Sequence, residues 1–311
     1  FISVINKKEG ASCITTHLLL KNRDMRFIKM TGGLGNQMFI YAFYMRMKKH
    51  YSNTRIDLSD MVHYKAHNGY EMHRVFNLPP IEFRINQPLK KVIEFLFFKK
   101  IYERKQVPSS LVPYDKKYFW PLLYFKGFYQ SERFFADMAD DIRKAFTFNP
   151  RLSNRKTKEM SEQIDHDENA VSIHVRRGDY LEPKYWKTTG CVCQLPYYLN
   201  AIAEMNKRIS QPSYYVFSDD IAWVKENLPL PKAFFIDWNK GAESWQDMML
   251  MSRCRHHIIC NSTFSWWGAW LNPRENKTVI MPERWFRHCE TPDICPDKWI
   301  KVPINQPDSI Q

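Results

Sequence analysis

The sequence predicts an α/β fold made of two Rossmann-like domains that face each other across a cleft. From about residue 170, short apolar runs alternate with segments whose apolar residues recur at helical spacing. The chain opens in the same way, with a strand at 26–30, a glycine-rich loop at 31–37, a helical run at 38–50 and a strand at 54–58. Such alternation of strands and helices is typical of parallel, doubly wound sheets.

The elements of the second half are the clearest. Apolar runs predict strands at 170–175, 214–217, 233–236, 256–260 and 278–281, with helices between them at 196–209, 220–228, 243–254 and 263–271. In the first half, the pattern blurs over 59–125, and 127–146 is interpreted as a loop entering a helix. Asn149-Pro150 and the polar stretch 153–169 mark a boundary, which divides the chain into domains at 25–150 and 151–311.

Composition limits the classes of partner and compartment. The 311 residues carry 46 Lys and Arg against 33 Asp and Glu, a net charge of +13, so we expect an anionic partner: a phosphorylated small molecule, acidic lipid or nucleic acid. Seven cysteines cannot all pair, which favours a reducing, cytoplasmic compartment. The sequence has no apolar run long enough to span a membrane. Residues 1–24, ahead of Met25, are expected to be an extraneous or disordered leader.

Polar side chains follow each of the first four strands of the second half. Ligands bind beyond the carboxyl ends of the strands in parallel sheets, so these side chains are expected to converge on one site. The residues are His174, Arg176, Arg177 and Asp179 after the first strand, Ser218, Asp219 and Asp220 after the second, Asp237 after the third, and Asn261, Ser262 and Thr263 after the fourth.

The adjacent arginines indicate an anion site. Each guanidinium is a planar fork of donors that matches phosphate oxygens two at a time, so Arg176 and Arg177 suit a diphosphate. They are alternatively surface residues, or partners of Asp179. His174 shares its strand face with Arg176, and it is either a ligand contact or a buried core histidine.

Two further segments bring backbone N–H groups to the start of a helix. The loop "TGGLGNQMF" (31–39) contains Gly33 and Gly35, which permit close approach of a ligand, and Asn36, which either caps the helix or points into the cleft. In "NSTFSWWGAWL" (261–271), Ser262 and Thr263 supply hydroxyls at a helix N-terminus, which is either an anion cradle or only a cap. Asp219 and Asp220 are expected to contact a base or ribose, or to cap the next helix.

Two features suggest roles that we weigh against simpler ones. Asp165-His166-Asp167 has the D-x-D pattern of metal-dependent sugar transferases, but it precedes its strand, at the wrong edge of the sheet, so we interpret it as a solvated loop and expect no metal. The segment "LKKVIEFLFFKKIYERK" (89–105) is basic and amphipathic. This segment is either a core helix with a solvated basic face or a helix that contacts the inner face of an anionic membrane peripherally.

Taken together, these motifs resemble those of the bacterial α-1,2-fucosyltransferases of glycosyltransferase family 11. The resemblance rests on "GGLGNQMF" (32–39), "GFYQSERFF" (127–135), "HVRRGDY" (174–180), "VFSDD" (216–220) and "NSTFSWWGAWL" (261–271). It implies a GT-B fold, GDP-β-L-fucose as the donor in the C-terminal domain, and transfer with inversion to the 2-hydroxyl of a terminal β-galactoside in a surface glycan. The acceptor would lie on the N-terminal domain.

The resemblance also implies roles for individual residues. Arg176 would hold the β-phosphate and neutralise the departing GDP, Asn36 would reach the reacting centre, and Arg177 and Asp179 would shape the site. The residues implied to contact the donor are Gly33, Gly35, His174, Arg176, Arg177, Ser218, Asp219, Asp220, Ser262, Thr263 and Phe264. For the general base, Asp179 and a dissociative reaction without a side-chain base stay open.

Other functions remain possible from the sequence alone. The nearest is a fucosyltransferase that makes another linkage or modifies protein. Outside enzymes, the basic charge fits a nucleic-acid binder, but this charge is scattered along the chain and does not lie in an aromatic-studded groove. An inactive nucleotide-sugar-binding protein is a third possibility, against which the intact Arg176, Asn36 and Thr263 argue.

Overall fold

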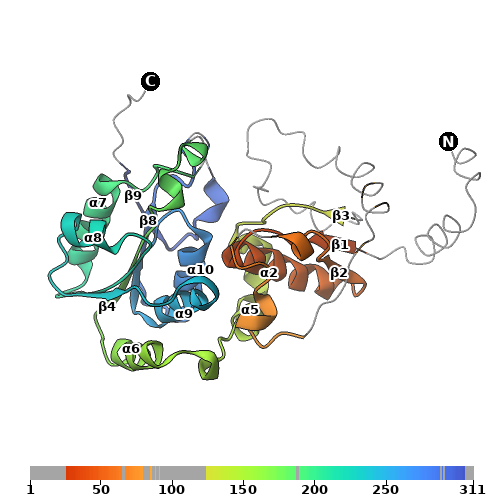
Figure 1. Cartoon of the computed structure of the whole chain (residues 1–311), viewed down its shortest axis with the longest axis horizontal. Helices are drawn as coiled ribbons and strands as arrows, with labels where there is room; N and C mark the ends of the chain where they lie inside the picture. The colour runs from red at the N-terminus through yellow and green to blue at the C-terminus, as the bar shows by residue number, and fades with distance from the viewer. Residues whose placement is uncertain are drawn as a thin grey trace, which may run out of the picture.

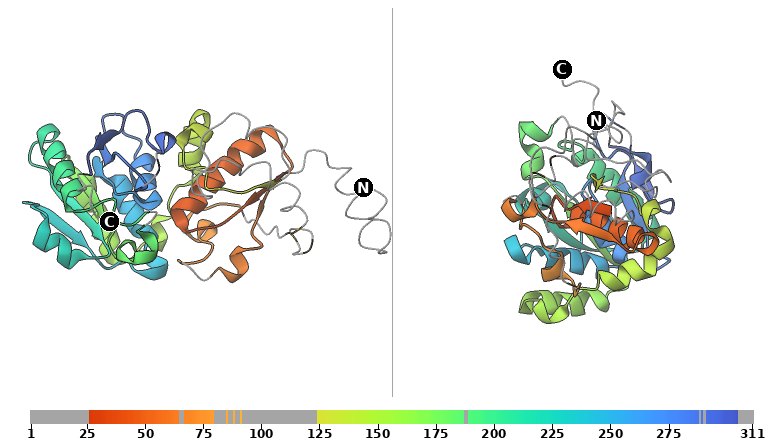
Figure 2. Two further views of the ribbon diagram at one scale, coloured as in Figure 1. Left: turned by 90° about the horizontal axis from the view of Figure 1, so that it is seen from above. Right: turned by 90° about the vertical axis from the view of Figure 1, so that its right-hand side faces the viewer.

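The computed structural model describes residues 26–64, 67–79, 85, 88, 91, 124–186, 189–287, 289 and 291–304. It contains two separate parallel sheets, one of three strands and one of six, which form two lobes along the long axis of the molecule (Figures 1 and 2). The expected leader at 1–24 lies outside the described residues, as does nearly all of the basic segment 89–105.

The N-terminal sheet is a compact βαβ unit with one added strand. Strands β1 (Arg26–Lys29) and β2 (Thr54–Asp57) are parallel and are connected by the long helix α2 (Leu34–His50). Strand β3 (Tyr124–Phe125) pairs with the other side of β1, so the order is β2-β1-β3. Helix α2 starts four residues earlier than predicted. Gly32 takes a left-handed φ of 84°, so the chain turns at this residue and the helix begins two residues later.

The C-terminal sheet has the strand order β6-β5-β4-β7-β8-β9, with every pair parallel. This is the order 3-2-1-4-5-6 of a dinucleotide-binding Rossmann sheet. Its strands are β4 (Ala170–Val175), β5 (Ser213–Ser218), β6 (Ala233–Ile236), β7 (His256–Ile258), β8 (Val279–Pro282) and β9 (Ile300–Val302). The connecting helices are α7 (Leu195–Arg208), α8 (Ile221–Asn227), α9 (Trp245–Arg253) and α10 (Thr263–Leu271).

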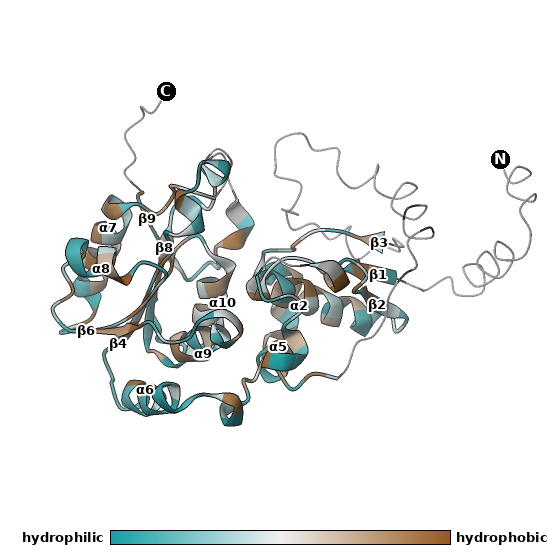
Figure 3. Cartoon of the chain, in the orientation of Figure 1, coloured by the Kyte–Doolittle hydropathy of each residue, from teal (hydrophilic) through white to brown (hydrophobic). Residues whose placement is uncertain are grey.

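Two parts of this half differ from the sequence prediction. The edge strand β9 was not predicted, because only three residues of a short apolar run pair with β8. The polar stretch 153–169, for which only a domain boundary was predicted, contains helix α6 (Arg155–Asp165). Its residues are largely hydrophilic (Figure 3), and it buries only Thr157 and Ile164, so its apolar face is too narrow to produce a clear helical pattern.

In the described first half, 127–146 also forms more regular structure than one loop and one helix. It contains two short 3-10 helices at Glu132–Phe134 and Ala136–Met138, followed by α5 (Ala139–Ala145). A further short helix, α3 (Met72–Val75), lies in the region where the pattern had blurred.

One hydrophobic core joins the two lobes. Helices α2 and α10 pack against each other between the sheets (Figure 1). The ring of Phe39 on α2 lies with its centroid 4.5 Å from that of Trp266 and 4.8 Å from that of Trp267, both on α10 and both fully buried. The cluster extends from Ile28 in the N-terminal sheet to Trp299 beside β9. The relative position of the lobes is therefore fixed by packing, and so is the space between them.

Candidate active site

A cavity of about 590 Å³ lies between the lobes, beyond the carboxyl ends of β4, β5 and β6. Its volume falls in the range of small-molecule sites, roughly 300–1,000 Å³. The N-terminal lobe contributes Gly33, Leu34, His67, Asn68 and Glu71. The C-terminal lobe contributes His174, Arg176, Phe217, Ser218, Asp219, Ile221, Ile236, Asp237, Asn239, Lys240, Gly241, Ser244, Asp247, Met251 and Phe264.

Strand β4 places His174 and Arg176 in this cavity and Arg177 outside it. Successive side chains of an extended segment point to opposite sides, so residues 174 and 176 share one side. Arg176 lines the cavity, whereas the guanidinium of Arg177 lies 4.0 Å from the ring centroid of Trp223 on α8 and pairs with Asp220. The two guanidiniums therefore point to different surroundings.

Arg176 is held by carboxylates on one side. Its Nε and Nη2 each lie 2.9 Å from Oδ1 of Asp179, and Nε lies 3.7 Å from Oδ2 of Asp219. Burial opposes the charge, but the hydrogen bond and charge of Asp179 raise the pKa of Arg176 above its usual value. In the described part of the chain, Nη1 has no hydrogen-bond partner. The arrangement leaves a fixed cation with a donor available to an anion.

Arg177 is hydrogen bonded to Asp219 and Asp220 beside Arg176. The backbone N–H of Arg177 donates to Oδ1 of Asp219 at 2.8 Å, and its Nε donates to Oδ2 of Asp220 at 3.1 Å. Asp220 also caps α8 by accepting from the N–H of Trp223, and its own N–H donates to Oγ of Ser218. Of this group, only Ser218 and Asp219 line the cavity.

His174 is a buried, neutral imidazole. Its Nδ1 lies 3.2 Å from Sγ of Cys260. The centroid of its ring lies 6.0 Å from that of Phe264, and both residues line the cavity. Burial, with a contribution from Arg176, lowers the pKa of His174 to about 3. His174 therefore adds no positive charge to the site at neutral pH and can only donate or accept a hydrogen bond there.

Asp247 on α9 lines the cavity together with the carboxylates of Glu71, Asp219 and Asp237. Its Oδ1 accepts a hydrogen bond from Nδ2 of Asn239 at 2.8 Å, and Asn239 is anchored in turn by Asn154. Burial raises the pKa of Asp247 to about 7, although the bond from Asn239 lowers it. From the sequence, Asp247 was predicted only to lie within a helix. A lone acid among the apolar residues of "WQDMMLM" is the signal that could have identified it.

The glycine and hydroxyl residues at the starts of α2 and α10 serve mainly to join the lobes. Gly35 is buried, and a Cβ there would lie 2.7 Å from the backbone carbon of Thr263. Ser262 caps α10 through a bond from the N–H of Phe264. Only Gly33 and Phe264 of these residues line the cavity.

Asn36 neither caps α2 nor lines the cavity. The N-cap of α2 is Gly33, which makes no side-chain capping bond, and Oδ1 of Asn36 accepts a hydrogen bond from Nε2 of Gln130 at 2.8 Å. Gln130 belongs to the "GFYQSERFF" segment. The structure therefore connects two of the sequence motifs to each other through Asn36.

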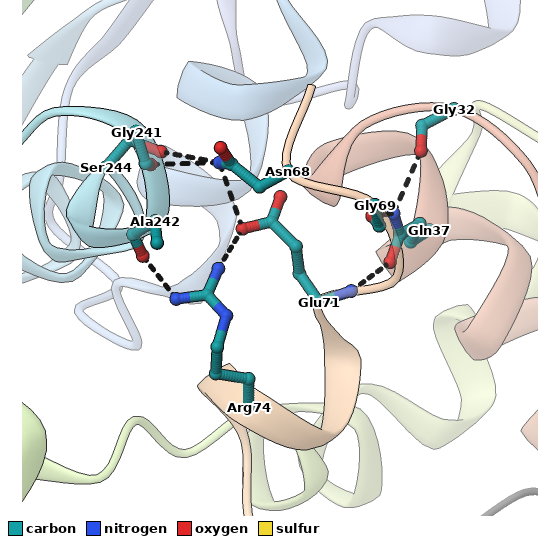
Figure 4. A network of polar contacts seen from close by, with 9 residues as sticks. All are labelled: Gly32, Gln37, Asn68, Gly69, Glu71, Arg74, Gly241, Ala242 and Ser244. Atoms are coloured by element: carbon teal, nitrogen blue, oxygen red, sulfur yellow. Dashed lines mark hydrogen bonds and ion pairs between the residues drawn. The ribbon is translucent and has the colours of Figure 1, made fainter. Parts of the chain in front are cut away.

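The loop at 67–71, in which no site residue was predicted, forms part of the N-terminal wall of the cavity. This loop is tied to both lobes (Figure 4). Nε2 of Gln37 donates to the carbonyls of Gly32 and Gly69 at 2.9 and 2.7 Å, and Oε1 of Gln37 accepts from the N–H of Glu71 at 2.9 Å. Asn68 donates to the carbonyl of Gly241 at 2.9 Å, across the cavity.

The D-x-D residues are engaged in structural contacts. Asp165 ends α6 and pairs with Arg253, and Oδ2 of Asp167 accepts from the hydroxyl of Tyr215 at 3.0 Å. They are thus bound to protein groups and do not form the solvated loop that we predicted. Across the described residues, no three His, Cys, Asp or Glu side chains lie together as a metal site would require. No helix in the described ranges is long and apolar enough to span a membrane.

Comparisons with known proteins agree with the motifs. The model of the family described as glycosyl transferase family 11 matches residues 10–302. An alpha-1,2-colitosyltransferase from Escherichia coli is 32% identical over 292 residues, covering 88% of this chain and 97% of the relative. Galactoside alpha-(1,2)-fucosyltransferase 1 from Ateles belzebuth is 31% identical over 160 residues, covering 49% of this chain and 43% of the relative.

A solved structure supports the fold. The NodZ alpha-1,6-fucosyltransferase co-crystallized with GDP aligns with a TM-score of 0.51 and 15% identity, covering 83% of this chain and 95% of that chain. With two parallel sheets on either side of a cavity, the fold is α/β of the GT-B type, as predicted. The match of the family model over nearly the whole chain confirms the resemblance seen in the motifs. The chain belongs to glycosyltransferase family 11.

Proposed function

We propose that this enzyme transfers L-fucose from GDP-β-L-fucose to the 2-hydroxyl of a terminal β-galactoside, with inversion at the anomeric carbon. The observation that carries the proposal is Arg176, a cation fixed by Asp179 at the wall of a cavity between two GT-B lobes. The α-1,2 linkage is supported by the names of two relatives from distant organisms. We further propose that the enzyme works in the cytoplasm of a bacterium on a surface polysaccharide, with any membrane contact being peripheral.

The leaving group would be stabilised by Arg176. When the bond between the anomeric carbon and the phosphate oxygen breaks, negative charge develops on the β-phosphate of GDP. Arg176 is positioned before the reaction, so its donors need no reorganisation at that moment, which is the most effective form of electrostatic catalysis. The same cation would serve the role that a divalent metal has in other glycosyltransferases, and we propose that no metal is required.

The base of the donor would be recognised by Asp247. Guanine presents two donors side by side, N1–H and the 2-amino group, and a carboxylate accepts both. Asp247 lines the cavity and is oriented by Asn239. Asp219 and Asp220, which we had expected to contact base or ribose, are held by the backbone and guanidinium of Arg177. Asp219 still lines the cavity and would lie near the diphosphate or ribose.

A second donor is favoured by one comparison. The relative that is 32% identical over most of its length is a colitosyltransferase. Colitose is L-fucose without its 3-hydroxyl group, so the two donors share GDP, the anomeric linkage and the L-galacto ring. A fucosyltransferase with another linkage or a protein acceptor, and a binding protein for nucleotide sugars or nucleic acid, are the remaining alternatives.

The function is tested by measuring transfer with defined substrates. Purified enzyme is incubated with GDP-fucose or GDP-colitose and with lactose, N-acetyllactosamine or galactosyl-β-1,3-N-acetylgalactosamine, and released GDP and product linkage are determined. We expect an α-1,2-fucosylated galactoside, formed equally well in the presence of a chelator. Products made only from GDP-colitose would replace the donor that we propose. Inhibition by chelator that manganese reverses would contradict the metal-free reaction, and no GDP release with any donor would reject the function.

The affinity for GDP is expected to rise with pH because of Asp247. The guanine donors bind the ionised carboxylate, and burial raises the pKa of Asp247 to about 7. Between about pH 6 and about pH 8, its ionised fraction rises by roughly tenfold, and the association constant should rise by the same factor. Asp247→Asn should bind GDP about 10- to 100-fold more weakly, because one acceptor and the charge are lost.

Isothermal titration of GDP at both pH values checks this expectation. The phosphates of GDP titrate alike with either protein, so the difference between wild type and Asp247→Asn isolates the carboxyl group. An unchanged pH dependence in the variant would show that guanine lies elsewhere.

A further inference from the structure

His67 occupies an unusual place at the wall of the active-site cavity. It comes from the N-terminal lobe, on the side proposed for the acceptor, and lines the cavity together with Arg176 of the other lobe. Its ring lies directly on Gly33, where a Cβ would approach the ring carbon Cγ to 3.1 Å. A side chain at position 33 would push this ring away, so the glycine of the first loop leaves room for the histidine.

The backbone of His67 is held in a conformation that costs energy. Its φ is 56°, in the left-handed region that residues other than glycine seldom adopt. Such strain is found preferentially at functional sites, where the surrounding structure enforces it. Here the following residues enforce it, because Gln37 fixes Gly69 and Glu71, and Asn68 is bound to Gly241 of the opposite lobe (Figure 4).

Of the acidic side chains that line the cavity, Asp219, Asp237 and Asp247 belong to the C-terminal lobe, the side proposed for the donor, and Glu71 belongs to the N-terminal lobe. Asp179 is committed to Arg176, Asp219 accepts from the backbone N–H of Arg177, and Asp247 is hydrogen bonded to Asn239. Glu71, the second titratable group from the N-terminal lobe, accepts from Asn68 and from Arg74. His67 lines the cavity, and its ring makes no hydrogen bond with any described residue, so its nitrogens are available to a ligand there.

We propose that His67 is the general base of the transfer reaction, an inference that rests on the proposed function. One ring nitrogen accepts the proton of the acceptor hydroxyl as the oxygen of that hydroxyl forms its bond to the anomeric carbon. The bond from this carbon to the phosphate oxygen breaks, and its electron pair leaves with GDP beside Arg176. The imidazolium then releases the proton to solvent, which restores the neutral base.

The charges around His67 favour the neutral imidazole that this role requires. Burial lowers the pKa of His67, Arg176 lowers it further, and Asp179 opposes them. Besides these two charged groups on the segment after β4, Tyr64 lies beside the ring, with centroids 6.4 Å apart, and the N-terminus of α2 lies at Gly33. The pKa of His67 is below its usual value, so the base is free at neutral pH.

The test compares His67→Asn with His166→Asn. Asparagine tolerates the left-handed backbone and cannot act as a base, so the loop should keep its shape. His166 is an exposed residue at the end of α6, away from the cavity, and its variant should keep wild-type kcat. With saturating GDP-fucose and the galactoside that the wild type accepts, kcat of His67→Asn should fall by about 10²-fold or more.

Three further measurements make the outcome decisive. Affinity for GDP and melting temperature should be unchanged in His67→Asn, and the fall of wild-type kcat at acid pH should disappear in the variant. The proposal would be overturned by a near-wild-type kcat in His67→Asn, or by a reduced kcat that still falls at acid pH. The proton acceptor would then be Asp179 or the departing phosphate. A wild type that uses neither GDP-fucose nor GDP-colitose would instead reject the proposed function.

Discussion

Arg176→Lys is expected to lower kcat by about 10³-fold, the loss that follows removal of a donor at a developing oxyanion. Lysine keeps the charge but replaces the planar fork by a single ammonium group. In the native site, Arg176 lines the cavity and its Nε and Nη2 bind Asp179, which leaves Nη1 as a donor without a partner among the described residues. An ammonium group cannot bind Asp179 and present a second, oriented donor with the same rigidity. The charge should therefore turn toward Asp179 and away from the phosphate.

The measurement is the rate of transfer at saturating GDP-fucose, together with the melting temperature. The fold should be unaffected, because the positive charge that balances Asp179 is retained. Arg155→Lys is the matched control, since Arg155 is exposed on α6 and, among the described residues, pairs with Glu159 one turn away. That variant should behave like the wild type. If Arg176→Lys retained near-normal turnover, the fork would not be the group that stabilises departing GDP.

The α/β fold and the position of Arg176 beyond the end of β4 could be predicted from the sequence, because both depend on local patterns. Alternating apolar runs and helical segments specify a parallel sheet, and the carboxyl ends of its strands specify where polar groups meet. Arg176 and Arg177 were predicted to bind one diphosphate together, but they are separated by strand geometry, in which residues 174 and 176 share one side. The same parity that associated His174 with Arg176 thus also separates Arg177 from them.

The N-terminal wall of the cavity could not be predicted in this way. His67, Asn68 and Glu71 lie outside any strand or long helix, and long-range hydrogen bonds from Gln37 and to Gly241 set their positions. No periodicity records such contacts. Asp247 was missed for a different reason, because a single acid within an apolar helix shows its role only when the helix is placed against the cavity.

The geometry of the site depends on the core that joins the lobes. Arg176 belongs to one lobe and His67 to the other, so any rotation between the lobes changes the space available to the substrates. The contact between α2 and α10 is the central part of this core. Gly33 and Phe264 lie at the N-termini of α2 and α10 and line the cavity. The helix ends that join the lobes therefore also shape the site.

Trp267→Ala is accordingly expected to destabilise the protein by about 3–5 kcal/mol, the cost of truncating a buried aromatic residue. Trp267 is fully buried on α10, and its ring packs in a stacked arrangement on Phe135, with centroids 5.6 Å apart. Its Nε1–H donates to the carbonyl of Gly35 on α2 at 2.9 Å. The variant loses this packing and also leaves a buried carbonyl without its donor, so the loss should lie at the upper end of the range.

Urea denaturation followed by tryptophan fluorescence measures this loss, with Trp186→Ala as the control. Trp186 is 44% exposed in the loop after β4, and its removal should change the free energy of unfolding by no more than about 0.5 kcal/mol. Because a typical domain is stable by only about 5–15 kcal/mol, Trp267→Ala should unfold at a much lower urea concentration. GDP should protect Trp267→Ala less than it protects Trp186→Ala, because the N-terminus of α10 that carries Phe264 would be less firmly placed. Equal midpoints for the two variants would show that the lobes are held together by contacts other than this helix pair.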